Sequence, residues 1–589
     1  MSSKLRMPVG ALLLFSAMSV VVATAKEVLL EKGQEILVER NVAMVTRDGV
    51  TLRADVFRPN RDGKFPVILE RIPYDKRIEN FGPKAASQGY VFIVQDCRGR
   101  FASDGEWYPL RDEQNDGYDA VEWAAALPYA NGKVGMFGFS YSALTQLFAA
   151  MASPPHLTCI MPGFMASDAH AQWVYPGGVF SQALNQGWST ALAINALERR
   201  VGRTAQPSHW DMKQPLISYP LLDVGGAAGL CDFYYDWVRH PAYDAYWKAW
   251  SVEEHFAAIK VPALHFGAWY DYFAEGTVRN YAGFRDHASS PEARQGQRLV
   301  MMVGGHAGPG PKIGEVDYGK DSVVDNWALA LRWFDHALKG EANGLEREKP
   351  VKYFVMGKNV WREADAWPVP GARPTAFYLH SGGRANTLAG DGVLVREAPA
   401  AGAVDQLVYD PANPVPTVGG PAFGEASLKQ GPYDQREVEK RPDVLVYTTA
   451  PFAEDLEIVG EVRVDLHVSS TAVDTDFTAK LVDVAPDGTA INLLEGIQRA
   501  RYRNSRERAE LMVPGEVYPV TVGLGPIAHA FLRGHRLRLE ISSSNFPHFA
   551  RNPNTGAAHD SGDRTEVTAT NRIHHGATHA SALWVEVAP

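Results

Sequence analysis

The chain has 589 residues, of which 46% are hydrophobic and 21% charged, and its formal net charge is −10. A single hydrophobic core stops growing near roughly 250–300 residues, so this length predicts two or three globular domains. The negative charge is spread along the chain without a basic block, which argues against a nucleic-acid partner. The cysteines Cys97, Cys159 and Cys231 are too few for a disulfide framework, although they leave one bridge open. The absence of CxxC and HExxH motifs gives no support to a metal site.

The first 25 residues have the organisation of a secretory signal peptide. Lys4 and Arg6 supply positive charge ahead of an almost wholly apolar run over residues 8–22. This run is shorter than the ~20 residues that a membrane-spanning helix needs. We therefore expect cleavage after Ala25 and a mature protein that is soluble, periplasmic or secreted, and without a membrane partner. An uncleaved membrane anchor is the alternative interpretation of this segment.

Residues 26–167 and 256–350 share one pattern, in which short apolar runs alternate with helical spacing. The runs at 66–69 and 90–94 are typical of buried strands, whereas residues 112–126 have the spacing of a helix. Strands that alternate with helices predict a mostly parallel sheet covered by helices. We therefore expect an α/β domain built from these two segments.

The rest of the chain divides into two further regions. Residues 168–255 are rich in Trp, Tyr and Ala with helical spacing, so we expect a helical cap that interrupts the α/β domain. Residues 351–589 contain short alternating strands, such as 444–447, 461–466 and 536–541, separated by Gly, Pro, Asn and Asp. This pattern predicts an all-β sandwich, and we expect a jelly roll.

The stretch around Ser140 is the most informative in the sequence. An apolar strand ends in Gly138-Phe139-Ser140, and an apolar helix begins at once, which is typical of a nucleophile elbow. The helix N-terminus favours developing negative charge beside the serine, and the backbone N–H of Tyr141 is placed to donate to an oxyanion. Ser142 stands where the G-x-S-x-G pattern has its second glycine. A buried helix N-cap serine is the alternative interpretation.

A serine nucleophile needs a base and an orienting acid, which in α/β-hydrolases follow it in the order acid, histidine. Asp271 follows the apolar run 262–266, and His306 follows the run 299–303 within a glycine-rich loop. Both runs are expected to end at the same sheet edge as the strand before Ser140. We therefore predict a catalytic triad of these three residues.

Further motifs accompany the triad. They are Arg71-Ile72-Pro73-Tyr74-Asp75-Lys76, Asp96-Cys97-Arg98-Gly99-Arg100, Trp269-Tyr270-Asp271, Asp474-Thr475-Asp476-Phe477 and Ser543-Ser544-Asn545-Phe546-Pro547. With them the chain resembles, over nearly its whole mature length, the family of bacterial cocaine esterase, α-amino acid ester hydrolases and Xaa-Pro dipeptidyl-peptidases. The resemblance implies a three-domain serine hydrolase. It also implies that the Tyr74 hydroxyl is a second oxyanion donor beside the N–H of Tyr141.

The resemblance also bears on the substrate. The amino acid ester hydrolases of the family carry carboxylates just after the triad acid, which bind the α-ammonium of the substrate. This chain has Tyr272, Phe273 and Ala274 there, which disfavours an α-amino acyl substrate. Phe273, together with Trp173 and Trp188 of the expected cap, resembles instead the apolar acyl pocket of the cocaine-esterase branch.

These observations predict a hydrolase that cleaves ester or amide bonds of small molecules with a hydrophobic acyl group. The expected mechanism passes through an acyl-enzyme and needs neither a cofactor nor a metal. Two enzymatic alternatives stay open: a Xaa-Pro dipeptidyl-peptidase, and an α-amino acid ester hydrolase or β-lactam acylase. A third alternative is a non-catalytic carbohydrate-binding protein, given the β-sandwich and the 14 tryptophans. The sequence also leaves a homo-oligomer open.

Overall fold

The computed structural model describes the chain from Ala25 to Pro589 with five internal gaps. The described residues are 25–78, 81–201, 220–223, 229–400, 403–423 and 428–589. The expected signal peptide therefore lies outside the described residues, except for Ala25, which begins the first strand.

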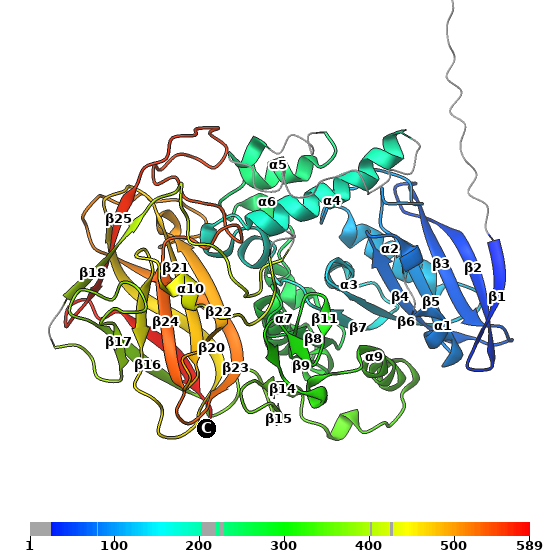
Figure 1. The fold of residues 1–589 in the computed structure, drawn as a ribbon. Coiled ribbons are helices and arrows are strands. Elements are labelled where there is room, and N and C mark those ends of the chain that lie inside the picture. The colour runs from blue at the N-terminus through cyan, green and yellow to red at the C-terminus, as the bar shows by residue number, and fades with distance from the viewer. Residues whose placement is uncertain (1–24, 79–80, 202–219, 224–228, 401–402, 424–427) are drawn as a thin grey trace, which may run out of the picture.

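A large mixed sheet forms the first domain (Figure 1). In spatial order its strands are β1 (Ala25–Glu31), β2 (Gln34–Val45), β3 (Thr51–Pro59), β5 (Val91–Asp96), β4 (Phe65–Ile72), β6 (Ala130–Phe139), β7 (Leu157–Gly163), β8 (Leu264–Ala268), β9 (Arg298–Met302), β14 (Val351–Val355) and β15 (Val360–Ala364). From β5 to β14 all neighbours run parallel, whereas β1, β2 and β3 at one edge and β15 at the other pair antiparallel. The parallel centre confirms the α/β class.

Helices cover both faces of this sheet. They are α1 (Gly82–Ser87), α2 (Glu113–Ala125), α3 (Tyr141–Ala152), α7 (Ala274–His287), α8 (Pro291–Gln295) and α9 (Asn326–Phe334). In β4, Val67 and Leu69 share a core with residues of α2 and α3, whereas Ile68 shares the opposite core with residues of α1 and α9. A strand buried on both faces is apolar at every position, which explains the continuous apolar runs of the sequence.

A helical cap is inserted between β7 and β8. Its elements are η2 (His170–Val174), η3 (Pro176–Gly178), α4 (Gln182–Val201), η6 (Leu221–Asp223), α5 (Asp232–Arg239), α6 (Ala245–Lys248) and η7 (Glu253–Ala258). The described part of this insertion contains no strand. In Figure 1 the helices α4, α5 and α6 lie along one side of the molecule, over the junction of the first sheet with the C-terminal domain. Of the helices in the described ranges, none is both long and apolar enough to cross a membrane.

The C-terminal domain is all-β, as the sequence predicts. Its strands are β16 (Arg373–His380), β17 (Val393–Val395), β18 (Ala403–Tyr409), β19 (Leu445–Thr448), β20 (Leu456–Ser470), β21 (Asp476–Val484), β22 (Ala490–Arg499), β23 (Tyr518–Phe531), β24 (Arg536–Ser542), β25 (Ala569–His575) and β26 (Ala582–Val587). All of them pair antiparallel except β17 with β19. Among its described residues this domain has two short helices, α10 (Arg436–Glu439) and the 3-10 helix η11 (Ala500–Tyr502).

The junction of the two sheets differs from the expected limit at residue 351. The strands β14 and β15 lie within the range assigned to the jelly roll, yet β14 pairs parallel with β9 and extends the first sheet. The remaining limits drawn from the sequence stay predictions. The three cysteine thiols are buried and unbridged, so this structure contains no disulfide among them.

Candidate active site

Ser140 occupies a sharp corner between β6 and α3. Its backbone angles, φ 57° and ψ −126°, lie in a region that residues with a side chain seldom adopt. A Cβ built on Gly138 would overlap the Cβ of Ser142, so only glycine fits before the corner. The corner brings the hydroxyl of Ser140 to the carboxyl-terminal edge of the parallel strands, as a nucleophile elbow does.

His306 connects Ser140 with Asp271. The Ser140 hydroxyl lies 2.9 Å from His306 Nε2, and His306 Nδ1 lies 2.7 Å from Asp271 Oδ2. The Asp271 side chain is fully buried, and its other oxygen accepts a hydrogen bond of 2.6 Å from the backbone N–H of Phe273. The structure thus brings together the three residues of the predicted triad, from loops that follow β6, β8 and β9.

Two donors lie beside Ser140 where an oxyanion would form. Tyr74 comes from the loop after β4, and its hydroxyl contacts Ser140 and accepts a hydrogen bond of 3.0 Å from Trp188 Nε1. Burial raises the pKa of Tyr74, so its hydroxyl stays protonated near neutral pH. The N–H of Tyr141 heads α3 and has no acceptor in the described part of the chain. Both predicted donors are therefore neighbours of Ser140, one through the contact of its hydroxyl and the other through the next peptide group.

An apolar cavity of about 400 Å³ opens at Ser140. Besides the two tyrosines, it is lined by Glu70, Ile72, Phe139, Ser142, Met165, Trp173, Leu184, Trp188, Phe273, His306 and Phe423. The ring centroid of Trp173 lies 5.1 Å from that of Trp188 and 6.2 Å from that of Phe273. The three predicted pocket residues therefore form one aromatic wall. The cap supplies two of these rings, and the loop after Asp271 supplies the third.

A buried polar cluster, which the sequence did not predict, anchors the ring of Tyr141. Its hydroxyl donates to Glu113 Oε1 at 3.1 Å, and Arg71 Nη1 lies 2.7 Å from Glu113 Oε2. Burial raises the pKa of Glu113, and the positive charge of Arg71 opposes that rise. Glu113 is the first residue of α2. No motif in the sequence around it indicated a contact with the elbow at Ser140.

The C-terminal domain also contributes residues that the sequence did not predict. The ring of Phe423 stacks on the imidazole of His306, with centroids 4.4 Å apart and an angle of 15° between the planes. Gln430 Oε1 accepts a hydrogen bond of 2.8 Å from the backbone N–H of His306, 124 positions away in sequence. No local pattern could connect residues so distant.

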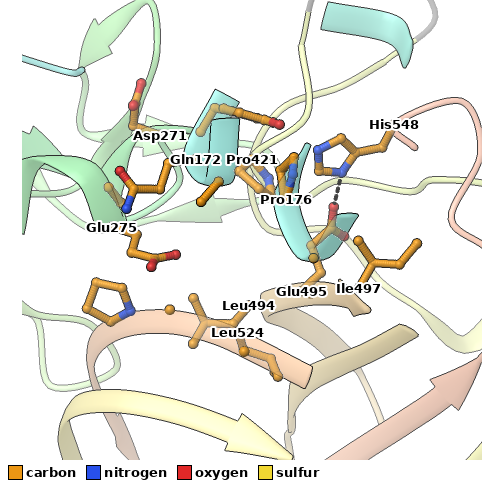
Figure 2. Close-up of a pocket in the computed structure, with 18 of the residues that line it drawn as sticks. Gln172, Pro176, Asp271, Glu275, Pro421, Leu494, Glu495, Ile497, Leu524 and His548 are labelled. Atoms are coloured by element: carbon orange, nitrogen blue, oxygen red, sulfur yellow. Dashed lines mark hydrogen bonds and ion pairs between the residues drawn. The ribbon is translucent and has the colours of Figure 1, made fainter. Parts of the chain in front are cut away.

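A second cavity, of about 290 Å³, also has Asp271 in its lining (Figure 2). The figure shows Gln172 and Glu275 on the side of Asp271, facing Glu495 and His548 of the C-terminal domain. Glu495 Oε1 and His548 Nδ1 are 2.6 Å apart and buried. In the described ranges no three His, Cys, Asp or Glu side chains are grouped so that they could hold a metal ion.

A hydrogen-bonded Ser-His-Asp arrangement at the carboxyl-terminal edge of an α/β sheet is typical of serine hydrolases. Residues 48–308 match the X-Pro dipeptidyl-peptidase (S15 family), and residues 343–584 match the X-Pro dipeptidyl-peptidase C-terminal non-catalytic domain. Cocaine esterase of Rhodococcus sp. (strain MB1 Bresler) is 36% identical over 572 residues, which cover 93% of this chain and 98% of that protein. The chain therefore belongs to the CocE/NonD-type serine hydrolase family and is a serine esterase or hydrolase.

Solved structures share the fold over nearly the whole chain. An α-amino acid ester hydrolase superposes with a TM-score of 0.80 at 25% identity and covers 97% of this chain and 100% of its own. A CocE/NonD family hydrolase from Staphylococcus aureus gives a TM-score of 0.70 at 21% identity, with 94% of both chains covered. These likenesses confirm an α/β-hydrolase fold with a C-terminal all-β domain.

Proposed function

We propose that this hydrolase cleaves carboxylic esters, and amides of similar size, through an acyl-enzyme formed on Ser140. The observation that carries the proposal is the continuous series of hydrogen bonds from Ser140 through His306 to Asp271. The Ser140 end of this series opens into an apolar cavity. Distances of 2.9 and 2.7 Å suit proton transfer between these groups without a prior rearrangement.

In the proposed mechanism His306 Nε2 takes the proton of Ser140 as Oγ attacks the substrate carbonyl. Asp271 stabilises the imidazolium, and the O–H of Tyr74 with the N–H of Tyr141 binds the oxyanion. The imidazolium then gives its proton to the leaving oxygen or nitrogen as the carbonyl–leaving-group bond breaks. Water, deprotonated by His306, releases the acyl group in the same way and restores the Ser140 hydroxyl.

The acyl group of the substrate is proposed to be hydrophobic and to lie against Trp173, Trp188 and Phe273. Aromatic side chains bury large apolar areas and stack on rings, so a benzoyl group gains more here than an acetyl group. The likeness to cocaine esterase supports the same preference.

Steady-state hydrolysis of p-nitrophenyl benzoate and p-nitrophenyl acetate tests this preference. Replacing Trp173 and Trp188 together by Ala should lower kcat/KM for the benzoate by about tenfold more than for the acetate, as the loss of one to two kcal/mol of ring contacts predicts. Trp250, a cap residue that does not line the cavity, provides the control variant Trp250→Ala. An equal loss on both esters would contradict a role of the two rings in acyl recognition.

A peptidase activity is the second candidate, because residues 48–308 match the X-Pro dipeptidyl-peptidase family. The same panel therefore includes Ala-Pro-p-nitroanilide. A kcat/KM for this amide above that of both esters would assign the site to proline-linked dipeptides instead.

We further propose that the protein is exported, on the basis of the charged and apolar pattern of residues 1–25. Intact-mass measurement of the protein recovered from its producing cells tests this. Export predicts an N-terminus at Lys26, and a mass that includes the first 25 residues would contradict cleavage.

A further inference from the structure

Two short segments of the C-terminal domain, residues 420–423 and 428–431, reach the histidine of the site. Gly420 and Gly431 join them through two backbone hydrogen bonds, of 2.7 and 2.8 Å, in an antiparallel bridge. In the first segment Phe423 stacks on the imidazole of His306, and in the second Gln430 accepts from its backbone N–H. The two segments therefore touch both the ring and the backbone of the same residue.

The amide of Gln430 ties these two contacts together. Its Oε1 accepts from the N–H of His306 at 2.8 Å, and its Nε2 donates to the carbonyl oxygen of Pro421 at 2.7 Å. Pro421 lies two residues before Phe423, so one side chain fixes the backbone of His306 relative to the ring that stacks on its imidazole. Pro421 also lines the second cavity, to which Asp271 contributes.

The loop that carries His306 is shaped to receive this amide. A Cβ built on Gly305 would overlap Gln430 Oε1. The φ angle of Gly305 lies outside the positive range that favours glycine, so the backbone itself would accept alanine. Gly305 is therefore required by the contact with Gln430 and not by its own conformation. With Gly304 before it and Gly308 after it, the loop has few side chains of its own to hold it in place.

We infer that Gln430 is a positioning residue, which holds His306 so that its two ring nitrogens meet Ser140 and Asp271 at the same time. The inference rests on the proposed acyl-transfer function and gives the domain described as non-catalytic in related proteins a part in catalysis. A misplacement of about 1 Å in a catalytic group can lower the rate by about 100-fold. The backbone restraint therefore acts on the rate of acyl transfer, and the Gln430 side chain is not among the residues that line the apolar cavity.

The variant Gln430→Ala in the full chain tests this inference. We expect kcat for p-nitrophenyl esters to fall about 10- to 100-fold with KM within about twofold of the unmodified protein. The rate at which a fluorophosphonate modifies Ser140 should fall by the same factor. The matched control is Gln435→Ala, because Gln435 donates to Val418 and Tyr433 in the same region without touching His306.

Two further variants separate positioning from a general structural effect. Gly305→Ala should reproduce the fall in kcat, because its methyl group displaces the amide of Gln430, and should add almost nothing in the Gln430→Ala background. Gln430→Glu keeps an oxygen for the N–H of His306, so it should recover part of the activity lost in Gln430→Ala. Its negative charge near the imidazole should also move the acid limb of kcat/KM to higher pH.

The inference is overturned if Gln430→Ala keeps kcat within twofold. It is equally overturned if Gln435→Ala shows the same fall in kcat, or if Gly305→Ala and Gln430→Ala are additive. These outcomes leave the proposed function standing as long as Ser140 of the unmodified protein reacts with the fluorophosphonate. Failure of that reaction would instead remove the proposed function itself.

Discussion

The indole N–H of Trp188 donates to the hydroxyl oxygen of Tyr74 at 3.0 Å, and this bond joins the cap to the proposed oxyanion site. Because the tyrosine oxygen accepts from the indole, its own proton is left to donate to another acceptor, and the same hydroxyl contacts Ser140. Trp188 therefore has two roles in the proposed reaction. Its ring lines the acyl cavity, and its nitrogen orients the donor that stabilises the oxyanion.

Replacement of Trp188 by Phe should lower kcat about three- to tenfold for benzoyl and acetyl esters alike, which corresponds to one hydrogen bond of ordinary strength. The ring that remains still lines the cavity, so KM for the benzoate should change little. Trp173→Phe is the control, because Trp173 Nε1 has no acceptor in the described part of the chain. A loss restricted to the benzoate would show that Trp188 acts only through its ring surface.

Replacement of Tyr74 by Phe removes one of the two proposed oxyanion donors. Loss of one such donor lowers kcat by about 100-fold or more in other hydrolases, and we expect the same here with a KM within a few-fold. Measurements of kcat and KM for Tyr74→Phe and the unmodified protein on p-nitrophenyl esters test this expectation. An unchanged kcat would mean that the oxyanion is bound by other groups.

The backbone of Ser140 stores strain that glycine would relieve. At φ 57° and ψ −126° a residue with a Cβ is destabilised by about 1–3 kcal/mol, whereas glycine adopts such angles readily. Both Ser140→Gly and Ser140→Ala should be inactive, and we expect the glycine variant to melt at the higher temperature. Thermal unfolding of the two variants measures the difference, and a lower Tm for Ser140→Gly would contradict strain at the elbow.

The buried His265 of β8 should make the protein less stable in mild acid. Burial lowers the pKa of His265 to about 4, and Nε2 lies 3.1 Å from the Gln297 side-chain oxygen. Between pH 6.5 and 4 the unfolded chain therefore binds a proton that the folded chain does not, so stability falls as the pH falls through this window. At pH 5 the loss from this one group is about 2 kcal/mol.

The variant His265→Gln isolates that contribution. It should be less stable than the unmodified protein at pH 7.5, because the packing of the ring against Tyr281 and Phe284 is lost. Its Tm should nevertheless fall less between pH 7.5 and pH 5. Parallel falls in Tm for the two proteins would mean that other groups control the acid sensitivity.

Sequence reasoning located the residues whose local patterns are unambiguous. A strand, a tight turn and an apolar helix around Ser140 form one short stretch, and Asp271 and His306 follow apolar strands directly. The sequence also predicted an all-β region over residues 351–589, but a strand pattern does not say which sheet a strand joins. The pairing of β14 with β9 depends on contacts across the whole domain.

The residues that the sequence missed come from distant segments. Phe423 and Gln430 meet His306 because the C-terminal domain folds against the first one, and Glu113 meets Tyr141 because α2 packs on α3. Each has an ordinary neighbourhood in the sequence, with no motif to mark it. A contact of this kind becomes visible only when the tertiary arrangement is known.

The most direct test of the central claim is reaction of the full chain with a fluorophosphonate, followed by mass spectrometry of its peptides. The account predicts a single adduct on the peptide that contains Ser140, which is absent from Ser140→Ala and from heat-unfolded protein. An adduct on another residue, or no adduct on protein that is shown to be folded, would contradict acyl transfer through Ser140.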